Sequence, residues 1–194
     1  IVVSINGNLI SAKVDLHVSM NEICYVHVDG RNGIRLKGEV IRIRGDIAQI
    51  QIYELANGIK SGDKVEFTGN MLSAHLGPGL LGQGYDGLQN PLPLLAEQAG
   101  WFLERGVYAD SLDYEKKWEF TPTAKVGDKL RAGEYIGTVP EGPFTHKIFV
   151  PFYMLGTYTL KSIVEKGEYN IVEQIAVITD ERGREQPLSM LFRW

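Results

Sequence analysis

The chain has 194 residues, of which 44% are hydrophobic and 23% are charged, and its net charge at pH 7 is -4. The length suits one large or two small domains. The composition is that of a globular protein and argues against wholesale disorder. Lys and Arg form no block, so nucleic acid is not expected as a partner.

No stretch approaches the roughly 18 uncharged apolar residues of a membrane span. Residues 1–7 lack the basic start and apolar centre of a signal peptide. We therefore expect a cytoplasmic protein. The single cysteine, Cys24, lies in an apolar run and has no partner for an internal disulfide, so we expect it to be buried and reduced.

The first seventy residues have the pattern of short β-strands rich in β-branched and aromatic residues. In residues 47–53, apolar and polar side chains alternate, as in a strand with one buried face. Strands of this length cannot protect their edges in an open sheet, so we predict a small closed barrel. The expected strands are 9–16, 22–28, 36–44, 47–53 and 64–68, separated by Gly- and Asn-containing turns.

Residues 70–106 are rich in Gly, Leu and Pro and form the expected connector, with one helix. Pro93 suits the first helical turn and Gly106 can end the helix. The apolar residues at helical spacing are Leu95, Ala99, Phe102 and Leu103. In isolation we expect the connector to be mobile or to cover its apolar surface by self-association.

A second β-rich unit follows residue 107, so the fold class is mostly β. Turns containing Gly and Pro join its segments. The expected strands are 117–121, 146–150, 157–163 and 174–179.

Residues 77–82 read GPGLLG and satisfy the G-x-G-x-x-G dinucleotide fingerprint. That fingerprint requires a buried strand before it and a helix after it, and neither is evident here. A close-packed backbone turn is the better interpretation. No glycine precedes a lysine, so the chain has no phosphate loop of the G-x-x-x-x-G-K-[ST] type and no cofactor-binding residue is assigned.

Residues 110–115 contain three acidic side chains, which suit either paired-carboxylate chemistry or a solvated turn. We favour the turn, because no histidine or nucleophile motif accompanies them. The histidines show no metal-ligand spacing, so neither a catalytic nor a metal-binding residue is assigned. The four histidines are His17, His27, His75 and His146.

Several phrases, in order along the chain, resemble the catalytic A subunit of archaeal and vacuolar-type rotary ATPases. The most specific is LDYEKKWEFTP at 112–122, which is similar to the insertion that distinguishes this subunit from its relatives. The other matching segments are 38–43, 50–54, 76–82, 86–92, 126–129, 136–141, 146–148 and 193–194.

The resemblance implies an N-terminal β-barrel at 1–69 and a connector at 70–106 that leads into the nucleotide-binding domain. It also implies an inserted bulge domain of barrel-sandwich type at 107–190, with the return to the nucleotide-binding domain beginning at 191–194. The phosphate loop and catalytic residues would lie beyond Trp194, so the chain itself is not expected to be an enzyme.

The intact subunit would bind ATP and Mg²⁺ and couple ATP turnover to transport of protons or sodium ions. Its partners would be the B subunits of the ring and the peripheral-stalk and rotor subunits. Contact with the membrane would be indirect, through the complex.

Two alternatives stay open. Residues 126–137 resemble the turn of biotinyl and lipoyl carrier domains, for which Lys147 is the nearby candidate lysine, although it lies in a strand-like segment. A β-barrel binding module of translation-factor type is the other alternative, and the low basic content counts against it.

Overall fold

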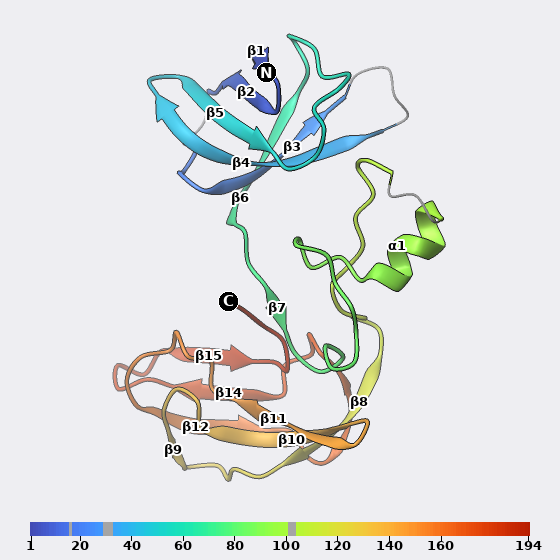
Figure 1. Cartoon of the computed structure of the whole chain (residues 1–194). Coiled ribbons are helices and arrows are strands. Elements are labelled where there is room, and N and C mark those ends of the chain that lie inside the picture. The colour runs from blue at the N-terminus through green and yellow to red at the C-terminus, as the bar shows by residue number, and fades with distance from the viewer. Residues whose placement is uncertain (16, 29–32, 101–103) are drawn as a thin grey trace. The chain divides into compact units, whose positions relative to one another are not determined.

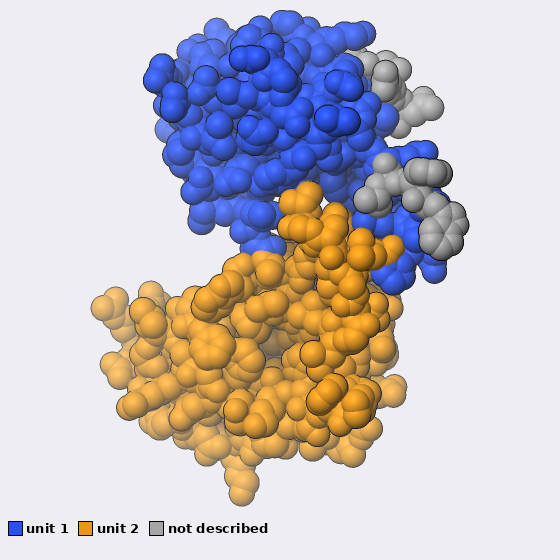
Figure 2. Space-filling model, viewed as in Figure 1, with its two compact units in different colours: residues 1–73, 93–109 blue, residues 74–92, 110–194 orange. Residues whose placement is uncertain are grey.

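The computed structural model describes residues 1–15, 17–28, 33–100 and 104–194. The chain divides into two compact units, each built from two stretches of sequence (Figure 2). Unit 1 contains residues 1–73 and 93–109, and unit 2 contains residues 74–92 and 110–194.

Unit 1 is a curled, antiparallel six-stranded sheet with the order β1-β2-β5-β4-β3-β6 (Figure 1). The outer strand β1 is bonded to the turn that leads into the other outer strand, β6: Val2 donates to the carbonyl of Asp63 at 2.8 Å, and Gly62 donates to that of Val2 at 2.8 Å. The predicted small barrel is thereby confirmed. The strands are β1 Val2–Asn6, β2 Leu9–Lys13, β3 Glu22–His27, β4 Arg35–Arg44, β5 Ile47–Ile52 and β6 Val65–Met71.

The interior of unit 1 comes from the alternation seen in the sequence. In β5, Ala48, Ile50 and Ile52 are buried and the residues between them are half-buried, as predicted. Cys24 is fully buried among these side chains, which confirms the expected burial. Asp29-Gly30, Asn32 and Leu16, which belong to predicted turns and strands, lie outside the described residues.

The connector contains the predicted helix, α1, at Leu92–Ala99. Pro93 lies in its first turn as expected. The predicted end at Gly106 is wrong: the helix stops at Ala99, and Gly100 follows with φ +71, a left-handed conformation that glycine adopts without strain. Phe102 and Leu103 lie outside the described residues. Self-association of the isolated connector stays a prediction.

Unit 2 contains two four-stranded sheets and one short pair (Figure 1). One sheet has the order β11-β10-β8-β13, the other has the order β15-β14-β12-β9, and β16 pairs with β7. The strands are β7 His75–Leu76, β8 Lys117–Pro122, β9 Lys129–Leu130, β10 Tyr135–Glu141, β11 Phe144–Phe149, β12 Tyr158–Ile163, β13 Gly167–Asn170, β14 Ala176–Thr179, β15 Glu185–Leu188 and β16 Phe192–Arg193.

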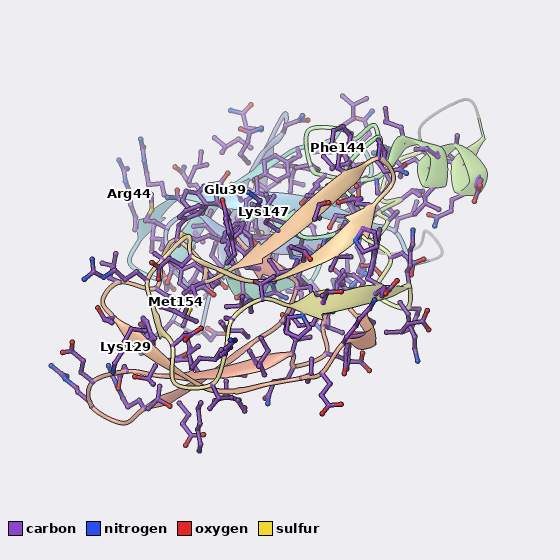
Figure 3. All side chains as sticks on the ribbon, turned by 90° about the horizontal axis from the view of Figure 1, so that it is seen from below. Glu39, Arg44, Lys129, Phe144, Lys147 and Met154 are labelled. Atoms are coloured by element: carbon purple, nitrogen blue, oxygen red, sulfur yellow. The ribbon has the colours of Figure 1, made fainter. Side chains whose placement is uncertain are left out.

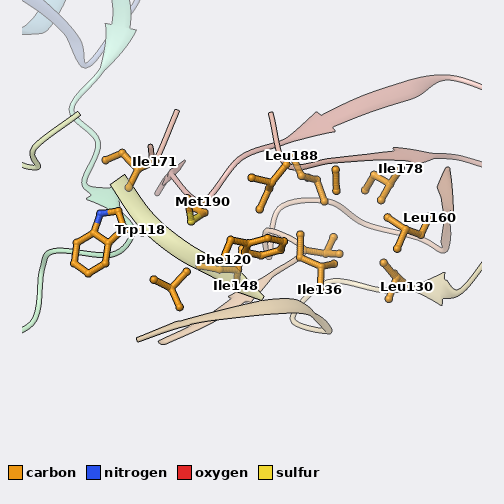
Figure 4. Packing of buried hydrophobic residues seen from close by; sticks show 14 of the residues in the cluster. Trp118, Phe120, Leu130, Ile136, Ile148, Leu160, Ile171, Ile178, Leu188 and Met190 are labelled. Atoms are coloured by element: carbon orange, nitrogen blue, oxygen red, sulfur yellow. The ribbon is translucent and has the colours of Figure 1, made fainter. Parts of the chain in front are cut away.

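The core of unit 2 combines side chains from both four-stranded sheets (Figure 4). Phe120 of β8 and Ile136 of β10 come from one sheet, and Leu160 and Ile178 come from the other; all four are fully buried. Burial of such side chains contributes about 1.5–3 kcal/mol each. The predicted mostly-β class, with a second β-rich unit of barrel-sandwich type, is confirmed.

Strand β10 was not predicted from the sequence, although it lies in the centre of its sheet. Gly137 and Pro140 interrupt it and carry the usual signals of a turn. Gly137 is nevertheless required by packing, since an added Cβ would lie 2.3 Å from Phe120 Cε2 and 2.8 Å from the Thr121 carbonyl oxygen. A glycine that admits a neighbouring ring cannot be told from a turn glycine in the sequence.

Replacing Gly137 by alanine tests this close approach. Overpacking of a buried site costs about 1–3 kcal/mol, so we expect Gly137→Ala to lower the free energy of unfolding by that amount in urea denaturation. Gly87→Ala is the control, because no atom lies within 4 Å of its added Cβ and Gly87 does not have a positive φ. Equal stability of the two variants would contradict the packing argument.

The burial of Cys24 predicts low thiol reactivity. Burial, and secondarily the charge of Glu22, raises the pKa of this thiol from 9.0 to about 12. At pH 8 the thiolate fraction is then about one in ten thousand in the folded chain, against about one in ten after unfolding. We expect labelling by an aromatic disulfide reagent to be about a thousand-fold slower without denaturant than with it.

The sign of the pH dependence follows from the raised pKa of Cys24. The folded state favours the neutral thiol, so this contribution to stability is present below about pH 9 and is lost as the pH rises toward about 12. Labelling of the folded chain should therefore accelerate about tenfold for each pH unit in this range. A labelling rate that is equal in the folded and unfolded chain would show that Cys24 is accessible.

Candidate functional site

A buried carboxylate in unit 2 is surrounded by hydrogen-bond donors. Glu141, at the end of β10, is only 5% exposed. Its Oε1 accepts hydrogen bonds from the backbone amides of Gly79, at 2.6 Å, and Leu81, at 3.1 Å. Its Oε2 lies 2.5 Å from Nδ1 of His146. We call these four residues the Glu141 site.

The register of the β10–β11 hairpin brings Glu141 and His146 together. Glu141 pairs with Phe144 and Val139 pairs with His146, so Glu141 and His146 are diagonal neighbours on one face of the hairpin. Diagonal neighbours lie within reach of long or aromatic side chains. The hairpin therefore presents a carboxylate and an imidazole to the loop formed by residues 77–82.

The charge of Glu141 also acts on a nearby phenol. The pKa of Tyr85 is raised by its burial and, secondarily, by the negative charge of Glu141. Tyr85 is therefore neutral at physiological pH. An ionised carboxylate has only acceptor atoms, so the hydrogen between Oε2 and the imidazole belongs to Nδ1 of His146. The Glu141 site thus contains an anion held by three N–H donors.

The 77–82 loop is the close-packed turn that the sequence analysis favoured. An added Cβ at Gly77 would lie 3.1 Å from the Met190 carbonyl oxygen, and Gly79 has φ +109. The preceding strand β7 has two residues and no helix follows the loop directly. The amides that a phosphate would require are bonded to Glu141 instead. This geometry does not support a dinucleotide site.

A second carboxylate, in unit 1, binds the segment that follows the helix. Glu54, just after β5, accepts hydrogen bonds from the Gly106 amide, at 2.8 Å, and from the Tyr108 hydroxyl. The same hydroxyl accepts a bond from the Lys37 amide at 2.7 Å. Arg105 Nη1 adds bonds to two backbone carbonyls at 55 and 57, each 2.7 Å. We call Glu54, Gly106 and Tyr108 the Glu54 site.

The Glu54 site requires a glycine and a neutral phenol. Gly106 has φ +75, and an added Cβ would lie 3.0 Å from the Arg35 carbonyl oxygen. The pKa of Tyr108 is raised far above its usual range, first by burial and then by its hydrogen bond to Glu54. The hydroxyl therefore keeps its proton and donates a hydrogen bond to the Glu54 carboxylate. Gly106 therefore packs against the barrel and bonds to Glu54, and it does not end the helix as predicted.

The acidic segment 110–115 forms the predicted turn. Asp113 accepts hydrogen bonds from the amides of Glu115 and Lys116, both at 3.0 Å, and Asp110, Asp113 and Glu115 are exposed. The exposed carboxylates and the turn bonds of Asp113 are those of a solvated turn.

The histidines are separated, each in its own surroundings. His27 lies 2.8 Å from Glu66, and His75 Nδ1 lies 2.6 Å from the Tyr114 hydroxyl. His146 belongs to the Glu141 site and His17 is exposed. Within the described part of the chain, no cluster of three or more His, Cys, Asp or Glu residues has the geometry to hold a metal ion.

Lys147 does not occupy the position that a carrier domain needs. It lies within β11, opposite Thr138, and its Nζ is 4.4 Å from the centre of the Tyr135 ring. Figure 3 shows Phe144 toward the end of the hairpin and Lys147 farther along the strand. A carrier lysine stands at a hairpin tip, so this geometry gives the carrier alternative no support.

A small barrel followed by a barrel-sandwich domain is the architecture on which the comparisons with known proteins agree. Residues 2–69 match the family model described as "ATP synthase alpha/beta family, beta-barrel domain". Residues 109–194 match "ATPsynthase alpha/beta subunit barrel-sandwich domain". The chain therefore belongs to the ATP synthase alpha/beta family.

Similar proteins place the chain within one branch of that family. It is 58% identical over 193 residues to a "V-type ATP synthase alpha chain" of Treponema denticola and 52% identical to one of Borrelia garinii subsp. bavariensis. It is 50% identical over 194 residues to "V-type ATP synthase alpha chain 1" of Treponema pallidum. All three matches cover 100% of this chain and 32–33% of the relative. The recognised resemblance to the A subunit is confirmed.

The chain thus spans about a third of the length of these relatives. Among residues 1–15, 17–28, 33–100 and 104–194, no helix has the length and apolar character needed to cross a membrane. Neither carboxylate site was predicted from the sequence. Glu141 and His146 belong to segments that carry the family resemblance, but nothing in those segments indicated that they meet the 77–82 loop.

Removing the Tyr108 hydroxyl tests the Glu54 site. Tyr108→Phe leaves the Lys37 amide without this acceptor and Glu54 without this donor. We expect the free energy of unfolding in urea to fall by about 1–3 kcal/mol. Tyr158→Phe is the control, since that hydroxyl makes one 3.3 Å bond at the surface and its loss should cost less than about 0.5 kcal/mol. Equal effects would contradict an anchoring role for Tyr108.

Proposed function

We propose that this chain is the N-terminal, non-catalytic portion of the A subunit of a V-type ATP synthase. The observation that carries the proposal is the 58% identity to a V-type alpha chain along the full length of this chain. Two family models matched in order along the chain, over 2–69 and 109–194, support the same portion of the subunit. ATP and Mg²⁺ would bind in the remainder of the intact subunit.

The proposed division of labour assigns a role to each segment in chain order. Residues 1–69 form the barrel that assembles with B subunits in the ring, and 70–106 lead toward the nucleotide-binding domain. Residues 107–190 form the inserted domain, which contacts the stator, and 191–194 begin the return to the nucleotide-binding domain. The intact subunit couples ATP turnover to transport of protons or sodium ions, with peripheral-stalk and rotor subunits as further partners.

The proposed location is cytoplasmic and peripheral to the membrane, as part of the ATPase complex. A structural role for the chain is supported by both carboxylate sites. In each, the carboxylate accepts hydrogen bonds from backbone amides of the same chain. In both sites the groups involved are bonded to one another within the chain.

Deletions in the full-length subunit test this division. Without residues 1–69, we expect the subunit to fail to form a ring with B subunits in native mass spectrometry. Without residues 107–190, we expect the ring to form but to lose its stator subunits. The purified chain of 194 residues should release no phosphate from Mg-ATP above background, with the complete ring as the positive control.

Two results would refute parts of this assignment. Ring formation by a subunit that lacks the barrel would remove the assembly role of residues 1–69. Phosphate release by the purified chain that scales with its concentration would show that it contains a catalytic site of its own.

A further inference from the structure

The Glu141 site has the chemistry of a bound-anion site. Two backbone N–H groups, from Gly79 and Leu81, converge on a single oxygen of Glu141, and the imidazole of His146 approaches the other oxygen. Successive amides in a turn with one left-handed residue form a concavity that binds anions. Here Gly79 supplies the left-handed residue, with φ +109. The carboxylate therefore occupies the position that a free anion would take.

We propose that the amides of Gly79 and Leu81, together with His146, form a carboxylate-binding site that the chain fills with its own Glu141. The negative charge of this side chain then holds the 77–82 loop in place. The inference goes beyond the proposed function, because it concerns the internal chemistry of unit 2 and is independent of ATP turnover.

The loop has few other polar contacts that fix it. Apart from the two bonds to Glu141, the backbone donor nearest the loop is Gln83, which bonds back to the Leu80 carbonyl at 3.3 Å. Leu80 packs against the core cluster, but Leu81 is 50% exposed and an added Cβ at Gly82 would meet no atom within 4 Å. The Glu141 carboxylate is thus the polar anchor of this loop among the described residues.

The size and charge of the site define its ligand class. The enclosed group is a single planar carboxylate with donors on both oxygens, and charge-assisted bonds of this kind are about twice as strong as neutral ones. The pKa of Tyr85 is raised by its burial and by the charge of Glu141, so this phenol is neutral and adds no negative charge of its own. A small monocarboxylate such as acetate would satisfy the same three donors once the Glu141 side chain is removed.

The test combines side-chain removal with chemical rescue in the complete 194-residue chain. Glu141→Ala empties the site, and Glu141→Gln keeps its shape without the charge. Amide hydrogen exchange at Gly79 and Leu81, followed by NMR, is the readout. We expect exchange at both amides to accelerate about tenfold or more in Glu141→Ala, and by less in Glu141→Gln, while amides of β8 and β13 keep their wild-type rates.

Added acetate should then restore slow exchange in Glu141→Ala in a saturable manner, whereas acetamide, which has the same shape but no charge, should not. Glu185→Gln is the control variant, because Glu185 pairs with Lys161 at the surface of the same unit and its loss should leave the loop unchanged.

Three results would overturn the proposal. The first is wild-type exchange at Gly79 and Leu81 in folded Glu141→Ala. The second is rescue by acetamide equal to that by acetate, or no rescue by either. If Glu141→Ala does not fold, the neutral isostere decides: wild-type exchange at both amides in Glu141→Gln would show that the charge does not hold the loop.

Discussion

The architecture depends on carboxylates that accept hydrogen bonds from backbone N–H groups in segments outside the sheets. Irregular backbone has no ladder partners, and each buried amide left unpaired would cost about 1–3 kcal/mol. Glu141 satisfies two such amides in unit 2, and Glu54 satisfies one amide and a tyrosine hydroxyl in unit 1. The sheets supply the walls of each unit, whereas these two side chains fix the connecting segments to them.

This arrangement explains which parts of the fold could be predicted. The alternation of β5 follows from neighbouring residues, so its strand and its buried face were both correct. The carboxylate sites join residues far apart in sequence: Glu141 is 62 residues from Gly79 and Glu54 is 52 from Gly106. Local patterns contain no record of such partners. The failure to predict β10 has the same cause, because Gly137 is required by the Phe120 ring, which lies on another strand.

Sequence motifs and local geometry identify different properties of the chain. Ordered phrases such as LDYEKKWEFTP identified the family, which the two domain matches confirm. The geometry then removed competing interpretations, because the glycine loop has its amides occupied and Lys147 lies in mid-strand. The likeness of residues 126–137 to a carrier-domain turn therefore gives no support to a carrier function.

The chain passes between the two units at 73/74, 92/93 and 109/110, so each unit is discontinuous in sequence. Residues 75–76 form β7 only by pairing with β16 at 192–193, more than a hundred residues later. During synthesis, strands β1 to β6 have all left the ribosome once residue 71 has emerged. The strand pair of residues 75–76 can form only after β16 has been synthesised. Closure of unit 2 is therefore a late, non-local event in folding.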